Sequence, residues 1–576
     1  MLSKGRIHRM FVKKVKNSKG RVFLEVVDGV RGEGGRVKHI VAEKLGYLDD
    51  LDAEHGDGLS WAQERARELT EEGRPSAQAP EATPLKVGES RLRHLGAMAA
   101  LPILRRLGLK DACDAVDSRN PRKGYSSFDV IRLLILAQIH DPGSKRSAWL
   151  SRAEYLVGHG FSEDQMYRAI QALGRSWGQI KDFLYEATAR EYGVDLTYSH
   201  YDGCNFYFEI DREDEFRRKG PSKEGRPEPI VAFGLTTDAD LIPIDADVYP
   251  GNEPERPHFA EAMARQAKRR GSRRSVYVAD RGLNSGDNCY RAMAQGDGYI
   301  YGQSISSEKM RKWALLDSGY EDVRYDDLGR LCYKRKSWVD EEAELEVTGG
   351  DGRKRRVRVV QKQIVFWSRD YAEKQARERA RLVAKAKAFC KSPKSYTRAK
   401  VGDAAKFVTT AEFDEATGEL RESCRPSLDA AAIARDAELD GYFMVVSSET
   451  KMADQAILDA YSAQKGEELI FRVSKHFLKL RPVWLSREDC IKCHFLICYI
   501  CDLVLRILEV KVLKRAVPFE RVGEELREYD AAAIATDCYF VLRCNQTVSL
   551  LAAKSGADAS KATLSLQGAK KLFKGY

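Results

Sequence analysis

The chain of 576 residues carries a net charge of +10 and is 43% hydrophobic, which is enough for packed cores. Its length is too great for one ordinary domain and predicts three to five. The first residues contain no apolar run, so we expect no signal peptide. The most apolar stretch, Cys493 to Leu508, is interrupted by His494, Asp502 and Arg506, which argues against a membrane span. Twelve cysteines form no disulfide framework in a chain this long and favour a reducing, cytoplasmic location.

The positive charge is concentrated in one window. Residues 353–400 contain 17 Lys and Arg against 3 Asp and Glu, a net charge of +14 that leaves −4 for the rest of the chain. A run of charge is often a solvated helix face, and residues 372–388 alone permit that interpretation. Interleaved aromatic residues favour contact with a nucleic-acid backbone and its bases. These are Phe366, Trp367, Tyr371, Phe389 and Tyr396. A second basic cluster precedes Asp280 and comprises Arg265, Lys268, Arg269, Arg270, Arg273 and Arg274.

The N-terminal third of the chain divides into three parts. Residues 1–48 alternate between apolar and polar positions and predict a small basic β-unit. Residues 49–90 are acidic and polar and contain prolines, which predicts a linker preceded by a short helix. Residues 91–192 carry patterns of helical period and predict a helical domain. One of its helices is expected to start with a capping box formed by Ser162 and Gln165.

Strand-like alternation begins near residue 193. Residues 193–310 show three strand patterns followed by helix, strand, helix and strand, which predicts an antiparallel meander joined to a β-α-β unit and places the chain in the α/β class. The expected strands are His200–Ile210, Pro229–Thr237, Ile242–Val248, Ser275–Ala279 and Gly298–Gly302. The expected helices are Glu255–Arg270 and Ser285–Gln295.

Three further regions complete the chain. Residues 311–438 hold strand patterns on both sides of the basic helical segment, at Leu331–Trp338, Arg356–Val365 and Lys406–Thr410. Residues 439–512 begin with a buried strand and continue as long helices, at Asp454–Ser462, Glu467–Leu478 and Glu488–Leu508. Residues 513–576 are an Ala- and Lys-rich tail with one or two short elements.

Three segments that lie far apart in the chain each offer a carboxylate suited to a metal ion. Asp202 lies in an expected strand, Asp280 lies at the carboxyl end of another, where open α/β sheets bind ligands, and Glu468 lies in an expected helix. Tyr461, Glu468 and Lys475 are spaced by seven and share one helix face, so Lys475 is placed to hold a phosphate. Oxygen ligands of this kind suit a pair of Mg²⁺ ions and phosphoryl transfer on nucleic acid.

Each of these segments also has a purely structural explanation. Either aspartate can cap a turn or a helix, and Glu468 can pair with Arg472 on a solvated helix face. Two Cys-x-x-Cys pairs between residues 490 and 501 suggest a zinc site. However, Cys490 and Cys501 would lie roughly 16 Å apart along one continuous helix. Buried thiols packed in that helix are therefore the favoured explanation.

Together the segments resemble the bacterial insertion-sequence transposases of the IS4 superfamily, and most closely the IS1634 group. The helix from Tyr461 resembles the signature Tyr-x2-Arg-x3-Glu-x6-Lys, and residues 201–209 resemble Tyr-Asp-x-Thr-Thr-Phe-Tyr-Phe-Glu. There are two departures: Gln464 replaces the signature arginine, and residues 203–205 (Gly-Cys-Asn) differ from the usual residues after the first aspartate. Further similar segments are Lys44–Gly46, Lys219–Val231, Tyr249–Asn252, Val278–Leu283 and Leu480–Val483.

The resemblance implies an RNase H-like catalytic core, a mixed sheet with flanking helices, interrupted by a β-rich insertion domain. Residues 193–310 and 439–512 would form the core, and residues 311–438 would form the insertion and carry most of the positive charge. We expect the insertion to face DNA, and residues 91–192 to bind DNA ends or a second subunit. The implied DDE triad of metal ligands is Asp202, Asp280 and Glu468.

The activity implied by the resemblance is DNA transposition through two-metal phosphoryl transfer. Two Mg²⁺ ions, with Mn²⁺ as a substitute, would support cleavage of the element's ends and joining of the 3′-hydroxyls to target DNA. The implied partners are double-stranded DNA, at terminal inverted repeats and target, and a second copy of the chain in a synaptic homodimer at the bacterial nucleoid. Two alternatives are a metal-dependent nuclease without strand transfer and a non-catalytic DNA-binding descendant. The candidate DNA-binding residues are Tyr461, Gln464, Lys475, Arg281, Arg472, Lys354, Arg355 and Arg356.

Overall fold

The computed structural model describes residues 10–16, 21–31, 37–72, 85, 89–220, 227–392, 401–409, 426–535 and 537–576. The chain forms two compact units, one of residues 1–89 with 534–536 and one that comprises the rest. Three expectations lie outside the described residues. They are the proline-containing part of the expected linker, residues 221–226 within one family-like segment, and Tyr396 of the aromatic series.

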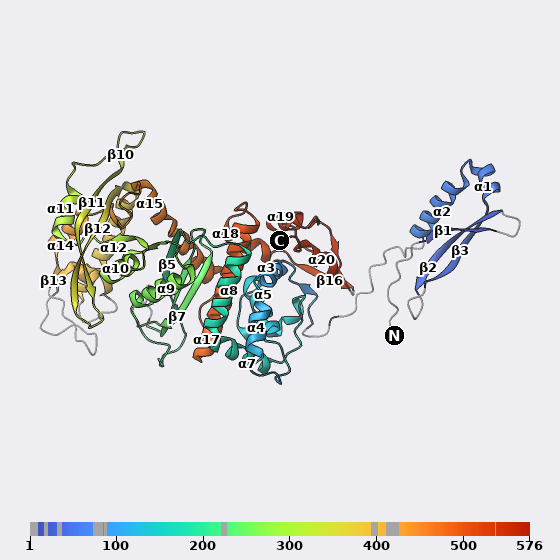
Figure 1. The fold of residues 1–576 in the computed structure, drawn as a ribbon, viewed down its shortest axis with the longest axis horizontal. Coiled ribbons are helices and arrows are strands. Elements are labelled where there is room, and N and C mark those ends of the chain that lie inside the picture. Colours follow the sequence, from blue (N-terminus) through green and yellow to red (C-terminus); the bar gives the residue numbers. More distant parts are fainter. Residues whose placement is uncertain are drawn as a thin grey trace. The chain divides into compact units, whose positions relative to one another are not determined.

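The first unit contains a three-stranded antiparallel sheet and two helices (Figure 1). Its small core includes Leu24, Leu51 and Ala62. A pair of helices stands where a single short helix was expected before the linker. The elements are β1 (Met10–Lys16), β2 (Val22–Arg31), β3 (Val37–Tyr47), α1 (Leu48–His55) and α2 (Gly58–Glu72).

The second unit begins with a short strand and a group of helices. The expected capping box of Ser162 and Gln165 forms at the start of α7, where each side chain bonds to the other residue's backbone N–H. The elements are β4 (Leu92–Arg93), η1 (Gly96–Ala99), α3 (Ala100–Arg106), α4 (Leu109–Asp117), α5 (Ser127–His140), α6 (Lys145–Leu150), η2 (Arg152–Glu154), α7 (Glu163–Arg175) and α8 (Trp177–Glu191).

Helix α17 (Glu488–Ile507), from a distant part of the chain, packs against α5 and α7 in this group (Figure 1). Its residues from Cys493 to Ile507 are all buried, which explains the apolar character of the segment. The paired cysteines lie on this one helix as buried thiols, as expected. Among the described residues, no helix combines the length and the apolar character that crossing a membrane requires.

A nine-stranded mixed sheet forms the rest of the unit, in the order β10-β11-β12-β15-β9-β8-β5-β6-β7. Strands β5, β6 and β7 form an antiparallel meander, and β8 and β9 run parallel to β5. This is the predicted meander joined to a β-α-β unit. The elements are β5 (Tyr198–Tyr207), β6 (Ile230–Thr237), β7 (Pro243–Pro250), α9 (Glu255–Arg270), β8 (Val276–Ala279), η3 (Arg281–Leu283), α10 (Gly286–Ala294) and β9 (Gly298–Gln303).

The strands from residues 311–438 extend this same sheet. Strand β15 pairs with β9 on one side and with β12 on the other, and β11 and β10 continue the antiparallel order (Figure 1). The elements are α11 (Glu308–Leu315), β10 (Asp322–Tyr325), β11 (Leu331–Thr348), β12 (Lys354–Ser368), α12 (Arg369–Lys391), η5 (Gly402–Phe407), β13 (Val408–Thr409), β14 (Ser427–Leu428), α14 (Ala430–Glu438) and β15 (Tyr442–Ser447).

Helices follow β15, and a small sheet closes the chain. This sheet has the order β18-β17-β16-β4, so the tail pairs with the strand at the start of the unit. The elements are α15 (Asp454–Ala463), α16 (Lys465–Arg472), the π-helical turn η6 (Val473–Phe477), α17, the π-helical turn η7 (Leu508–Val512), α18 (Phe519–Arg527), β16 (Ala531–Ala535), β17 (Cys538–Val541), α19 (Gln546–Lys554), β18 (Thr563–Leu564) and α20 (Leu566–Leu572).

The two faces of the large sheet are covered by different helices. On one face, Tyr201 and Ala279 belong to a core that includes buried residues of α9 and α10. On the other face, Val278 and Ile300 pack with Ile457 of α15. Because side chains alternate along a strand, a residue that directly follows Tyr201 or Ala279 belongs to the face of α15.

Candidate active site

Asp202 and Asp280 lie side by side at one level of the sheet. Strands β5 and β8 are parallel neighbours, and Tyr201 stands opposite Ala279 in their register. The next residue after each of these two is an aspartate, so Asp202 and Asp280 follow adjacent positions of neighbouring strands. Both aspartates follow residues of the α9 face, so both carboxylates belong to the α15 face.

Asp280 ends β8 and caps the short 3₁₀ helix η3. Its Oδ1 accepts a hydrogen bond from the backbone N–H of Arg281 at 2.7 Å and another from the Tyr461 hydroxyl at 3.3 Å. The capping role that the sequence left open is therefore real. The cap uses one oxygen of the carboxylate. Asp280 is exposed, so its second oxygen can accept a further ligand.

Tyr461 of α15 orients this carboxylate from a confined position. A Cβ atom built on Gly302 of β9 would lie 2.6 Å from the Tyr461 hydroxyl, so the glycine makes room for the phenol. Burial raises the pKa of Tyr461, and the charge of Asp280 raises it further. The phenol therefore remains protonated and donates its hydrogen to Asp280. The sequence suggested a contact of Tyr461 with DNA and gave no sign of this hydrogen bond.

Asp202 is half-buried, and its Oδ1 accepts a hydrogen bond from the backbone N–H of Gly203 at 2.8 Å. A Cβ atom on Gly203 would lie 1.9 Å from Oε1 of Glu255, the first residue of α9. Gly203 thus leaves room for the Glu255 carboxylate on the α9 face of β5, opposite the face to which Asp202 belongs. No pattern in the sequence indicates this placement of Glu255.

Glu468 is exposed on α16, which packs against β5. The packing uses Ile470 and Phe471, which are buried in the same core as Cys204 and Phe206 of β5. Cys204 and Phe206 alternate in phase with Asp202, so α16 covers the face to which Asp202 belongs. The structure thus brings the helix of the third carboxylate onto the same side of the sheet as the two aspartates.

The three carboxylates do not form a tight cluster in this structure. Among the described residues, His94, His140 and Asp530 are the one group of three ligating side chains whose ligand atoms all lie within 4.8 Å of one another. Asp202, Asp280 and Glu468 are therefore more widely spaced. Carboxylate oxygens are the donors that Mg²⁺ prefers, and a pair of ions about 3.5–4 Å apart needs a wider set of ligands than a single ion. The donor chemistry fits such a pair.

The other residues expected at this site differ in their exposure and in their partners. Arg281 is exposed next to Asp280, and Lys475 is half-buried in the turn η6. Gln464, 9% exposed, is buried at the junction of α15 and α16. Arg472 forms an ion pair with Glu520 of α18. Of this set, Arg281 lies closest to the aspartates along the chain, and its side chain is exposed.

Acidic residues of the neighbouring strand β11 offset part of the positive charge of β12. Lys354 pairs with Glu346 of β11 at 2.6 Å, and Arg356 pairs with Glu344 at 3.2 Å. Arg355 lies over the ring of Tyr290, 5.6 Å from its centroid. Lys354, Arg355 and Arg356 are all exposed, so they can contact DNA, but two of them already have acidic partners across the hairpin.

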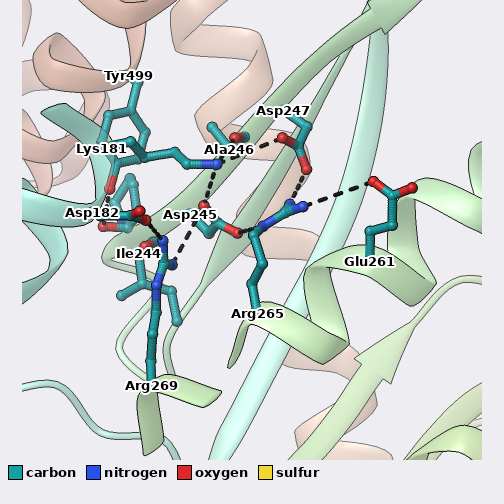
Figure 2. Close-up of polar contacts among 11 residues, drawn as sticks. Lys181, Asp182, Ile244, Asp245, Ala246, Asp247, Glu261, Arg265, Arg269 and Tyr499 are labelled. Atoms are coloured by element: carbon teal, nitrogen blue, oxygen red, sulfur yellow. Dashed lines mark hydrogen bonds and ion pairs between the residues drawn. The ribbon is translucent and has the colours of Figure 1, made fainter. Parts of the chain in front are cut away.

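The basic cluster before Asp280 turns largely inward. Arg265 of α9 pairs with Asp245 and Asp247 of β7, and Arg269 pairs with Asp245 and Asp182 (Figure 2). Lys181, 3% exposed, completes the group with an ion pair of 2.7 Å to Asp245. Two further members of the basic cluster have carboxylate partners: Arg270 pairs with Asp297, and Arg274 pairs with Glu449. These four arginines hold the sheet and its helices together.

A cleft of about 1010 Å³ is lined by Arg281, the residue after Asp280, and by neither Asp202 nor Asp280. Tyr371 of α12 lines it too, together with residues of β9, the loop after β9, α11, β15, η5 and α14. Four more cationic residues face it, namely Arg311, Arg379, Lys406 and Arg435, together with acidic Glu378, Asp403, Asp436 and Asp440. Several of these charges pair with one another, for example Arg379 with Asp440 and Lys406 with Asp436.

No protein-family model matches the chain, and no curated protein matches it either. Among solved structures, the chain is similar to a piggyBac transposase in a cryo-EM structure of its synaptic complex with hairpin DNA. The sequence identity is 8%, the TM-score is 0.37, and the alignment covers 76% of this chain and 79% of the other. A likeness at that TM-score does not establish a shared fold.

Proposed function

We propose that this chain is a DNA transposase with a DDE triad of Asp202, Asp280 and Glu468, related to the IS4 superfamily and its IS1634 group. The observation that supports this most directly is the register of β5 and β8, which sets Asp202 and Asp280 at one level. Helix α16, which carries Glu468, packs on the same face of β5. The meander joined to parallel strands, with helices on both faces, supports an RNase H-like core.

The three carboxylates act as ligands in this proposal. Two Mg²⁺ ions, or Mn²⁺ in their place, would supply activation of the attacking oxygen and stabilisation of charge on the leaving oxygen. Tyr461 fixes one oxygen of Asp280 through its hydrogen bond and leaves the other oxygen for a ligand. The rigid strands hold Asp202 and Asp280 in place before substrate arrives, so little reorganisation is needed when charge develops.

Double-stranded DNA is the proposed substrate, first at the element's terminal inverted repeats and then at the target. Arg281 beside Asp280 and the exposed basic residues of β12 would bind phosphates. We further propose a synaptic homodimer in the bacterial cytoplasm, with residues 91–192 as the region for end binding or dimer contacts. Residues 311–438 would be the insertion, here built as an extension of the core sheet.

The test uses the purified full chain and the DNA that flanks its gene on both sides. With Mg²⁺, we expect cleavage at imperfect inverted repeats and joining of the cut ends to a supercoiled target. Asp202→Asn, Asp280→Asn and Glu468→Gln should each lower both reactions by roughly 10²–10³-fold, since metal contacts are worth several kcal/mol to the transition state. Glu467→Gln changes the neighbouring carboxylate in the sequence and should retain activity.

Two results would overturn the proposal in different ways. Strand cleavage by Asp280→Asn at the rate of the unmodified protein would show that the metal-ligand assignment is wrong. The second result is a protein that cleaves intact DNA but does not join a supplied pre-cut 3′ end to the target. That result would identify a nuclease that uses the same carboxylates.

A further inference from the structure

A second group of ligating side chains lies away from the carboxylates of the sheet. His94 follows β4, His140 ends α5, and Asp530 lies between α18 and β16. Their ligand atoms all lie within 4.8 Å of one another, and the centroids of the two imidazole rings are 4.0 Å apart. Each histidine is 5% exposed, so this is an interior group and not a chance meeting of surface side chains.

The side-chain contacts of this group join ring nitrogens to carboxylate oxygens. His94 Nδ1 lies 3.0 Å from Oδ1 of Asp530, and His94 Nε2 lies 3.0 Å from Oε2 of Glu154. His140 Nε2 lies 3.0 Å from the same Asp530 oxygen, while His140 Nδ1 is buried and meets no hydrogen-bonding partner among the described residues.

A divalent ion would fit between Nδ1 of His94, Nε2 of His140 and Oδ1 of Asp530. It would leave Nε2–H of His94 to donate to Glu154. A metal-bound histidine typically donates its second N–H to a carboxylate in this way. Two carboxylates, those of Glu154 and Asp530, contact the histidines directly, so a cation bound here would have anionic partners.

We propose that His94, His140 and Asp530 bind a Zn²⁺ ion, with Glu154 orienting His94. Two imidazole nitrogens and one carboxylate oxygen are a mixed donor set typical of zinc, whereas Mg²⁺ prefers oxygen ligands. Three protein ligands leave a fourth position for water in a tetrahedral site.

The bound ion would link parts of the chain that are distant in sequence. Arg93 pairs with Ala531 in the β4–β16 ladder, so His94 and Asp530 stand beside this pair of strands. The backbone N–H of His94 also donates to the carbonyl of Glu154 at 3.0 Å. An ion here would join the start of the helical region, the end of α5 and the C-terminal tail, and would be separate from the proposed catalytic ions.

The test measures zinc binding by the full chain carrying Asp202→Asn and Asp280→Asn, which removes the carboxylate site of the sheet as a competitor. After dialysis against a chelator, titration with Zn²⁺ against a chromophoric chelator should reveal one tight equivalent and a rise in melting temperature. Co²⁺ in its place should give visible absorption bands from nitrogen and oxygen ligation. His94→Gln and His140→Gln should each abolish the tight equivalent, and His476→Gln, an exposed histidine elsewhere, should retain it.

A second variant keeps the proposal testable if a ligand variant fails to fold. Glu154→Gln preserves all three ligands and should weaken zinc affinity by roughly 10–100-fold. Absence of a tight equivalent from the starting protein would overturn the proposal. Retention of the equivalent by folded His94→Gln, or unchanged affinity in Glu154→Gln, would also overturn it.

Discussion

The large sheet carries two groups of acidic side chains, one on β7 and one formed by Asp202 within β5 and Asp280 just after β8, and their polar partners differ. Asp245 of β7 is fully buried and faces Lys181, Arg265 and Arg269 (Figure 2). Asp280 is exposed and accepts hydrogen bonds from a backbone N–H and a phenol. The first group is saturated by cations of the protein, and the second retains capacity for a cation from outside.

The pKa of Asp245 shows how strongly its partners act. Burial alone would raise it, but Lys181, Arg265 and Arg269 outweigh burial and hold it at about 2. A carboxylate so compensated has no further use for a metal ion. The difference teaches that a basic cluster close in sequence to a proposed metal-binding aspartate can belong to the framework of the fold.

The largest expected effect comes from removing the charge of the buried group. Asp245→Asn should destabilise the protein by about 3–5 kcal/mol. It removes the closest carboxylate of buried Lys181, at 2.7 Å, and leaves Asp247 at 3.5 Å. Equilibrium denaturation followed by tryptophan fluorescence measures the change. Asp202→Asn, the matched variant at the other group, should alter stability by less than about 1 kcal/mol. Equal losses in the two variants would remove the distinction between the groups.

A third acidic residue, Asp502 on α17, sharpens the comparison. It is buried, and its partners do not offset the effect of burial on its carboxyl group. Burial raises the pKa of Asp502 on α17 to about 8, although Ser474 and Arg506 act in the opposite direction. Ser474 also donates to the carbonyl of Ile470 at 3.0 Å, so a protonated Asp502 can donate to Ser474 in turn, across 2.7 Å.

This raised pKa predicts a pH dependence of stability. The folded pKa exceeds the unfolded value, so the contribution is full below about pH 4 and is lost as pH rises towards 8. Asp502→Asn keeps the shape and cannot ionise. Its stability relative to the unmodified protein should therefore rise by about 2 kcal/mol between pH 6 and pH 8. Denaturation midpoints at both pH values test this, and a difference that is constant with pH would contradict it.

A smaller effect is expected when a methyl group is added next to Tyr461, the hydrogen-bond partner of Asp280. Gly302→Ala would place a Cβ atom 2.6 Å from the Tyr461 hydroxyl and 3.0 Å from the Arg281 nitrogen, so the phenol must move away from Asp280. Overpacking of this kind costs about 1–3 kcal/mol. DNA cleavage should fall by roughly 10-fold. Gly282→Ala, whose added Cβ meets no atom within 4 Å, is the control and should cleave normally.

The smallest effect should follow from removing one hydroxyl. Tyr461→Phe loses the 3.3 Å hydrogen bond to Asp280 and keeps the ring. A bond of this kind is worth about 1 kcal/mol, so the Mg²⁺ concentration for half-maximal cleavage should rise roughly fivefold. Tyr371→Phe serves as the control, because Tyr371 lines the cleft beside Arg281. An unchanged Mg²⁺ requirement in Tyr461→Phe would show that the phenol does not orient the carboxylate.

Local patterns predicted the elements around Asp202 and Asp280 well, because alternation and turn residues reveal strands without any knowledge of partners. The same patterns do not show what stands opposite a residue. The positive charge of β12 was counted along the chain, whereas Glu344 and Glu346 of β11 offset it across the hairpin. The cluster of His94 with Asp530 joins residues 436 positions apart, which no spacing in the sequence reveals.

The continuity of the large sheet has a consequence for any attempt to isolate a minimal catalytic fragment. Strand β15 leads directly to α15 and α16, and it takes its hydrogen bonds from β9 on one side and from β12 on the other. A deletion of residues 311–438 would turn β15 into an unprotected edge, and exposed edges recruit other chains and aggregate. A shortened protein that is to remain in solution must therefore keep β12 or shield β15 with charged substitutions.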